Sequence, residues 1–161
     1  MAEAFAIQSA VRSSIGWKHV GWKIGCTSER AQKALKADGP FPGPVYQEQL
    51  FPSGSHVQTL ASNSRTTEPE IAFTLARDLP KKNEPWLVAE VLSAVATVHP
   101  SIEIVNPRLP KGFNDVVEWY VADGGLSHAL VLGPGVAPLK QDAYAKITNR
   151  ISINGQKKYS G

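Results

Sequence analysis

The sequence of 161 residues lacks several features that would place it in a specialised class. It contains one cysteine, Cys26, which excludes an internal disulfide framework. Its longest mostly apolar stretch, 88–98, is interrupted by Glu90 and falls short of the roughly 20 residues that a membrane span needs. The first 14 residues lack the basic, apolar and small-residue regions of a signal peptide. These absences predict a soluble, cytoplasmic protein with no membrane partner.

The charge is nearly balanced. There are 17 Lys and Arg residues against 14 Asp and Glu residues, which gives a net charge of +3. The basic residues are scattered and are not interleaved with aromatic residues, so we expect no nucleic acid partner. The length is that of one typical domain, and we expect a single domain over residues 1–161.

Hydrophobic periodicity predicts a mixture of helices and short strands. Apolar residues at helical spacing predict one helix that ends at Gly16 and another that runs from Pro85 to His99. Ser28 is expected to cap a short helix between them. Alternation and apolar runs predict strands at 19–27, 45–50, 56–60, 68–76, 101–105, 127–132 and 145–153. Gly and Pro at high density predict a loop over 38–44, and Asn154-Gly155 predicts a hairpin turn.

The first predicted strand has two unequal faces. Val20, Trp22 and Ile24 form a large apolar face, while the other face carries Lys23 between two glycines. Space beside those glycines would admit a ligand, and the lysine ammonium could stabilise a developing enolate or a substrate carboxylate. The alternative is an ordinary surface lysine whose apolar stem packs on the protein.

Two carboxylates occupy one face of the strand at 68–76. Glu68 and Glu70 are two residues apart and about 7 Å apart along the backbone, so their side chains can flank one cation. Pro69 between them donates no hydrogen bond and favours an edge position. Without a third ligand the motif is weak, and a solvated pair on the sheet surface is the more common explanation of such a pattern.

Glu103 supplies a third carboxylate. It lies within an otherwise apolar strand, where a charged side chain is costly unless it is paired, hydrogen-bonded or coordinated. A salt bridge to a nearby residue such as Arg108, or an outward orientation, would also satisfy it. If the three glutamates converge, their hard oxygen ligands favour Mg²⁺ or Mn²⁺ over zinc.

An ordered set of motifs connects these residues to a known family. They are Val20-Gly21-Trp22-Lys23-Ile24-Gly25, Gly39-Pro40 with Gly43-Pro44, Glu68-Pro69-Glu70-Ile71-Ala72-Phe73, His99-Pro100-Ser101-Ile102-Glu103-Ile104-Val105, and Val121-Ala122-Asp123-Gly124. In this order they resemble the 2-keto-4-pentenoate hydratase branch of the fumarylacetoacetate hydrolase superfamily, which includes hydratases and decarboxylases of 2-oxo acids. The resemblance covers nearly the whole chain.

The resemblance implies an α+β fold, a mixed β-roll with peripheral helices, and assembly into a homo-oligomer. It implies that Glu68, Glu70 and Glu103 are metal ligands, that Lys23 is the active-site lysine, and that Asp123 is an acidic residue near the site. Family members continue beyond the hairpin at 154–155, so the resemblance also implies an incomplete, C-terminally truncated domain.

The expected function is that of a metal-dependent lyase acting on a small 2-oxo acid through a metal-bound enolate, most similar to a 2-keto-4-pentenoate hydratase. The ligand set alone does not distinguish hydration from decarboxylation or C–C hydrolysis. The other alternative is an inactive homologue that acts through protein association, because missing strands would leave a sheet edge and apolar surface exposed.

Overall fold

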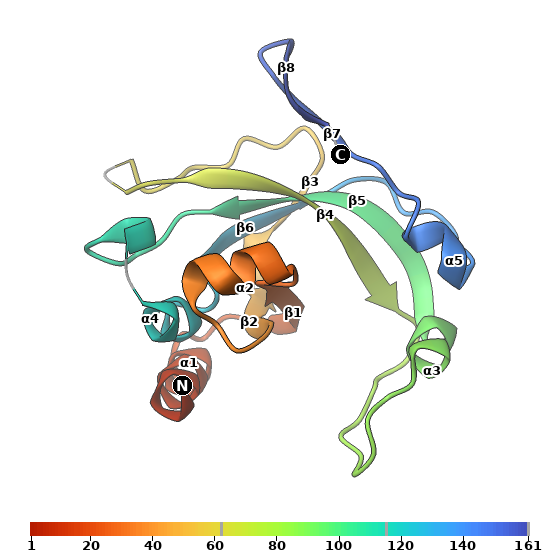
Figure 1. Cartoon of the computed structure of the whole chain (residues 1–161), viewed down its shortest axis with the longest axis horizontal. Helices are drawn as coiled ribbons and strands as arrows, with labels where there is room; N and C mark the ends of the chain where they lie inside the picture. The colour runs from red at the N-terminus through yellow and green to blue at the C-terminus, as the bar shows by residue number, and fades with distance from the viewer. Residues whose placement is uncertain (62, 115, 161) are drawn as a thin grey trace. The chain divides into compact units, whose positions relative to one another are not determined.

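The chain has an α+β fold in a computed structural model that describes residues 1–61, 63–114 and 116–160 (Figure 1). Its elements are α1 (Ala2–Ser14), β1 (His19–Gly25), α2 (Glu29–Leu35), β2 (Phe41–Tyr46), η1 (Gln47–Gln49), β3 (Leu50–Pro52), β4 (Thr66–Leu75), α3 (Val88–Ser93), β5 (Val95–Val105), η2 (Gly112–Asn114), α4 (Val117–Ala122), β6 (Ser127–Leu132), α5 (Gln141–Tyr144), β7 (Arg150–Ile153) and β8 (Gln156–Ser160). No helix in these described ranges is long and apolar enough to cross a bilayer.

The chain divides into two compact units. The first comprises Met1–Glu68 and Glu103–Val131, and the second comprises Pro69–Ile102 and Leu132–Gly161. A four-stranded sheet has the order β3-β6-β5-β4, and the unit boundary falls within β4, within β5 and within β6. The expectation of a single domain stays a prediction.

The core of the first unit forms where α1 packs against α4. Its buried side chains are Ala4, Phe41, Val105, Val117, Tyr120, Val121 and Leu126. Gln8 of α1 is buried with them, and its Nε2 donates hydrogen bonds to the carbonyl oxygens of Pro42 and Val121. One polar side chain therefore ties α1 to both β2 and α4.

The segment 38–44 contains a strand, so the loop prediction is wrong for its second half. Phe41–Tyr46 forms β2, which pairs antiparallel with β1 in a two-stranded sheet. Pro42 pairs with Ile24 and Pro44 with Trp22. Because the two prolines are two residues apart, their backbone nitrogens, which carry no hydrogen, face the same side of the strand. That side is the one not paired with β1.

The predicted helix before His99 is much shorter than its spacing indicates. Helix α3 covers only Val88–Ser93, and β5 begins at Val95. The residues that follow, Val95, Thr97 and Val98, are β-branched and favour extended backbone. Strand β5 is therefore more than twice as long as the predicted strand at 101–105.

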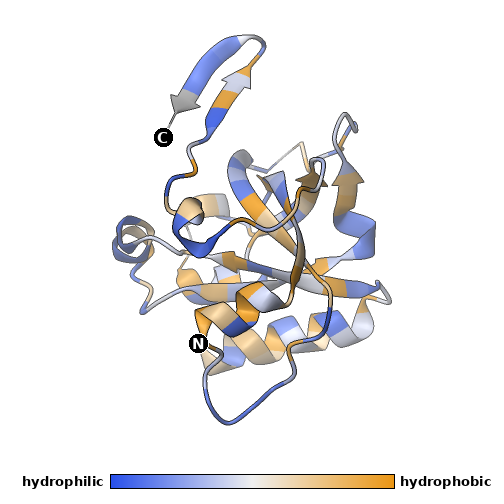
Figure 2. Ribbon diagram, turned by 90° about the vertical axis from the view of Figure 1, so that its right-hand side faces the viewer, coloured by the Kyte–Doolittle hydropathy of each residue, from blue (hydrophilic) through white to orange (hydrophobic). Residues whose placement is uncertain are grey.

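Two local predictions are confirmed. Ser28 is the N-cap of α2, and its side chain accepts a hydrogen bond from the backbone N–H of Ala31 at 3.2 Å. Asn154 and Gly155, with φ of 52° and 75°, form the turn between β7 and β8. Figure 2 shows β8 as mainly hydrophilic. The strand predicted at 56–60 is absent, and 145–153 contains a strand only from Arg150.

Candidate metal centre and its cavity

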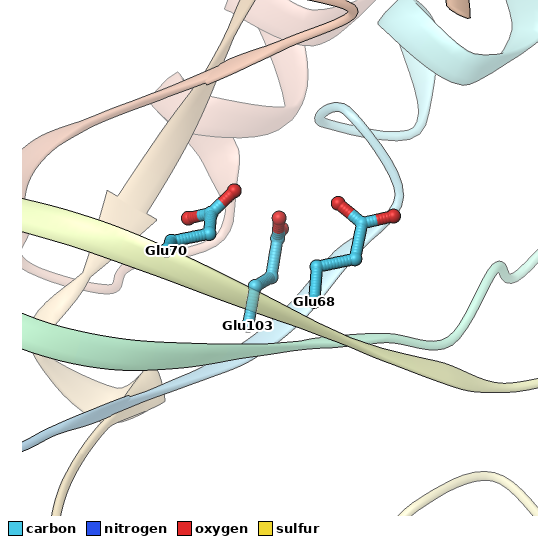
Figure 3. A group of neighbouring side chains, drawn as sticks. All are labelled: Glu68, Glu70 and Glu103. Carbon is cyan, nitrogen blue, oxygen red and sulfur yellow. The ribbon is translucent and has the colours of Figure 1, made fainter. Parts of the chain in front are cut away.

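Three carboxylates converge on one point. Each of Glu68, Glu70 and Glu103 offers a carboxylate oxygen, and these three oxygens lie within 4.8 Å of one another. Glu68 and Glu70 extend from β4 and Glu103 extends from β5, with all three carboxylates directed to the same side of the sheet (Figure 3). The alternation of side chains along β4 explains why Glu68 and Glu70 share a face.

Glu103 is the most deeply buried member of the group, at 1% exposure. The Nζ atom of Lys23 lies 2.7 Å from its Oε2 as an ion pair, yet neither oxygen accepts a well-oriented hydrogen bond from a described residue. A buried carboxylate oxygen without a partner is costly. The site therefore holds an oxygen that a cation could coordinate, and all three donors are of the hard type that Mg²⁺ and Mn²⁺ prefer.

Lys23 is held by two groups that are distant from it in sequence. Its ammonium pairs with Glu103 and donates a hydrogen bond to the carbonyl oxygen of Gly125 at 3.1 Å. The lysine side chain is only 8% exposed, so the lysine face of β1 points inward and the apolar face, including Trp22 at 50%, is exposed. An ammonium has three N–H donors, so a third is available to a ligand.

Glu68 is exposed, but its environment still alters its acidity. Partial removal of water by the surrounding protein is the largest influence and raises the pKa of the Glu68 carboxyl group. The positive charge of Lys23 opposes this rise, and the negative charge of Glu103 adds to it. A carboxylate with a raised pKa beside a second carboxylate is stabilised by any nearby cation.

A cavity of about 330 Å³ adjoins these residues within the first unit. Lys23 and Glu68 supply its charged wall. The remaining wall is mostly apolar and includes Phe41, Phe113 and Leu126. A charged end beside an apolar end suits a small acid with an apolar tail.

The turn that follows α4 is a part of the site that the sequence did not identify. Gly124, Gly125 and Leu126 all have positive φ, at 72°, 74° and 64°. This conformation directs the Gly125 carbonyl toward Lys23. A Cβ atom on Gly43 would lie 2.2 Å from the Gly124 oxygen, so β2 approaches the turn through a glycine. The sequence signals at this turn were the motif at 121–124 and the Gly124-Gly125 pair, and neither reveals that the Gly125 carbonyl holds Lys23.

Asp123 lies at the start of the same turn but contacts a different partner. Its Oδ1 accepts a hydrogen bond from Nε of Arg108 at 2.7 Å, and its Oδ2 accepts one from the Arg108 backbone N–H at 3.1 Å. It does not belong to the wall of the cavity at Lys23. Arg108 therefore pairs with Asp123, while Glu103 pairs with Lys23 and not with Arg108 as one alternative supposed.

Sequence comparison finds relatives that are named as hydratases. The chain is 37% identical over 134 residues to the 2-keto-4-pentenoate hydratase of Paraburkholderia xenovorans (strain LB400), a match that covers 81% of this chain and 49% of the relative. It is 30% identical over 154 residues to the 2-hydroxyhexa-2,4-dienoate hydratase of Comamonas testosteroni, covering 94% and 57%. The chain thus spans about half the length of the curated relatives it matches. No family model matches it.

Solved structures show the same fold. The 4-oxalocrotonate decarboxylase from Pseudomonas putida G7, complexed with magnesium and adipate, superposes with a TM-score of 0.75 at 19% identity. The match covers 99% of this chain and 61% of the decarboxylase. The same enzyme complexed with calcium and acetate gives 0.77 at 20% identity, with coverages of 99% and 60%.

The fold is therefore the α+β roll of the fumarylacetoacetate hydrolase type, as the sequence motifs predicted. Together with the hydratase relatives, this fold identifies the branch of the superfamily to which the chain belongs. The chain belongs to the 2-keto-4-pentenoate hydratase branch of the fumarylacetoacetate hydrolase superfamily.

Proposed function

We propose that Glu68, Glu70 and Glu103 bind one divalent cation, Mg²⁺ or Mn²⁺, in a lyase site for a small 2-oxo acid. The convergence of three carboxylate oxygens within 4.8 Å is the observation that carries the proposal. Oε1 of Glu103 supports it, because this buried oxygen lies outside the ion pair of Lys23 with Oε2, has no hydrogen-bond partner among the described residues, and would be satisfied by a cation. The magnesium and calcium complexes of the decarboxylase with the same fold agree with the choice of a hard cation.

The cavity residues have distinct roles in this proposal. A bound divalent cation would supply positive charge that favours the enolate form of a 2-oxo acid. Lys23, fixed by Glu103 and Gly125, would direct its remaining N–H to a substrate oxygen and add a second positive charge. The apolar wall that includes Phe41 and Phe113 would hold the tail of the acid and exclude water from it.

Asp123 has a positioning role in the proposal. By binding Arg108 through its side chain at the start of the 123–126 turn, it would fix the turn whose carbonyl holds Lys23. We propose hydration as the reaction, because the curated relatives are hydratases at up to 37% identity. The decarboxylase structures, at 19% and 20% identity, are too distant to favour decarboxylation over hydration. A homo-oligomer stays a prediction.

A turnover assay tests the proposed reaction. Incubation with 2-hydroxypenta-2,4-dienoate and Mg²⁺ should remove the dienoate absorbance, and EDTA should stop the loss. Glu70→Gln should reduce the rate at least about tenfold, as expected when a metal site is impaired. The exposed Glu84→Gln is the matched control and should leave the rate unchanged. Absence of turnover with the metal bound would favour the inactive alternative, and release of CO₂ from a 2-oxo diacid would favour decarboxylation.

A further inference from the structure

The apolar wall of the cavity beside Lys23 consists mostly of core residues. Most of its side chains belong to the core cluster of the first unit or pack against that cluster, and they are Cys26, Leu35, Phe41, Val105, Tyr120 and Leu126. Those within the cluster itself are between 3% and 8% exposed. A change of size at any of these positions would therefore disturb the packing of the fold as well as the cavity.

Phe113 of η2 is a different kind of wall residue. It lines the same cavity, but it is not among the described residues that make up the core or pack against it. It is 39% exposed, so it borders both the cavity and the solvent. A ligand that enters the cavity can reach such a side chain. The size of residue 113 can therefore change the shape of the cavity without changing the core.

The backbone at Phe113 is attached to the core. Tyr120, which is 3% exposed, donates a hydrogen bond from its hydroxyl group to the carbonyl oxygen of Phe113 at 2.6 Å. The preceding residue, Gly112, has a φ of 59°, and its N–H donates to the carbonyl oxygen of Leu109 at 3.0 Å. These contacts fix the point from which the Phe113 ring extends. A fixed backbone is what a side chain needs to select between ligands by shape.

The cavity has more space than the reacting end of a 2-oxo acid needs. Its volume is about 330 Å³, whereas an engineered apolar cavity of roughly 150 Å³ already holds a benzene ring. With the carboxylate and keto groups beside Lys23 and Glu68, the remaining space adjoins the apolar wall. The side chains of that wall then limit the bulk of the tail that fits.

We infer that Phe113 determines how bulky a tail the 2-oxo acid can carry. The inference rests on the proposed function, because it requires the acid group to lie at the charged end formed by Lys23 and Glu68. The Phe113 ring would pack against a short apolar tail and obstruct a longer one. Apolar pockets distinguish ligands that differ by one methylene group by roughly 10- to 200-fold, so one wall side chain is sufficient to set a preference.

Calorimetric titration of the Mn²⁺-loaded full chain with straight-chain 2-oxo acids, from 2-oxobutanoate to 2-oxooctanoate, tests the inference. In the natural sequence the affinity should rise with tail length until the tail meets the ring, and then fall. Phe113→Ala should move the optimum to a longer tail and strengthen binding of the acids beyond the natural optimum by at least about tenfold. Phe113→Trp should move the optimum to a shorter tail. Phe73→Ala removes an exposed ring outside the cavity and should leave the optimum unchanged.

The outcomes separate this inference from the proposed function. The same optimal tail length in the natural sequence, Phe113→Ala and Phe113→Trp would overturn the inference and leave the proposed acid site intact. Failure of every acid to bind the Mn²⁺-loaded chain would overturn both. The Mn²⁺ affinity without acid should be the same in all three proteins, because Phe113 supplies no metal ligand, and weaker Mn²⁺ binding in the variants would contradict a role limited to the tail. If Phe113→Ala does not fold, the shift in Phe113→Trp decides.

Discussion

At the scale of single residues, the buried charge of Glu103 determines much of the candidate site. Its carboxylate is 1% exposed, and among the described residues the cation paired with it is Lys23, whose side chain is 8% exposed. A charge buried to this degree is tolerated only with a partner. The sequence indicated that Glu103 needs a partner but left the choice open, because the partner lies 80 residues away in the chain.

Replacement of Lys23 by methionine should destabilise the fold strongly. Lys23→Met removes the charged partner of the buried Glu103 carboxylate, which costs about 3–5 kcal/mol in comparable pairs. The double variant Lys23→Met with Glu103→Gln should recover much of this loss, because no uncompensated charge remains. Urea unfolding of the metal-free protein measures both values. A loss below about 1 kcal/mol for the single variant would show that the pair is not buried as described.

The close approach of β2 to the 124–126 turn predicts a second effect at a single residue. Gly43→Ala places a Cβ atom 2.2 Å from the Gly124 oxygen, so the backbone must move, at a cost of about 1–3 kcal/mol. Gly39→Ala is a matched control, since nothing lies within 4 Å of its Cβ and its effect should stay within about 0.5 kcal/mol. Thermal unfolding of both variants tests this, and equal midpoints would contradict the predicted contact.

At the scale of elements, β2 and β5 show why local patterns mislead. Proline is excluded from most strands because it donates no hydrogen bond. Pro42 and Pro44 are tolerated in β2 because this strand has only one neighbour, β1, with which to form hydrogen bonds. The apolar residues of 88–98 fit a helix by spacing, yet those after Ser93 join a sheet. Pairing partners from distant segments decided both outcomes, and no local window contains them.

Helix α3 gives a prediction that depends on pH. The Lys82 ammonium and the backbone N–H of Leu87 both donate to Oε2 of Glu90 at 2.8 Å, and these hydrogen bonds lower the pKa of the Glu90 carboxyl group below its usual 4.5. The stabilisation from Glu90 is therefore complete above the unfolded-state pKa. It is lost as the pH falls through the lower folded-state pKa.

Carbon-detected NMR titration of the carboxyl groups should show Glu90 ionising below 4.5. Glu90→Gln should reduce stability at neutral pH, and the difference from the natural sequence should vanish in acid. Glu84→Gln, in the preceding loop, should show no such trend. A Glu90 pKa at or above 4.5 would mean that the two hydrogen bonds are not present in solution.

At the scale of the whole molecule, the family and the three acidic residues could be predicted from the sequence. The residues that surround the site could not. The spacing of Glu68 and Glu70 on one strand is a local property, and the ordered motifs identified the family. The Gly125 carbonyl that holds Lys23 depends on three successive residues with positive φ. The cavity beside Lys23 and Glu68 depends on packing between segments distant in sequence. Such packing leaves no periodic pattern.

Binding of one divalent ion per chain is the central claim, and a calorimetric titration of the metal-free protein with Mn²⁺ tests it most directly. We expect saturation at one ion per chain, at least about tenfold weaker binding in Glu70→Gln, and unchanged binding in Glu84→Gln. Unfolding measured at a free Mn²⁺ concentration of 100 times Kd should show about 2.7 kcal/mol of stabilisation. No saturable heat, or equal binding by Glu70→Gln and the natural sequence, would contradict the claim that the three glutamates form a metal site.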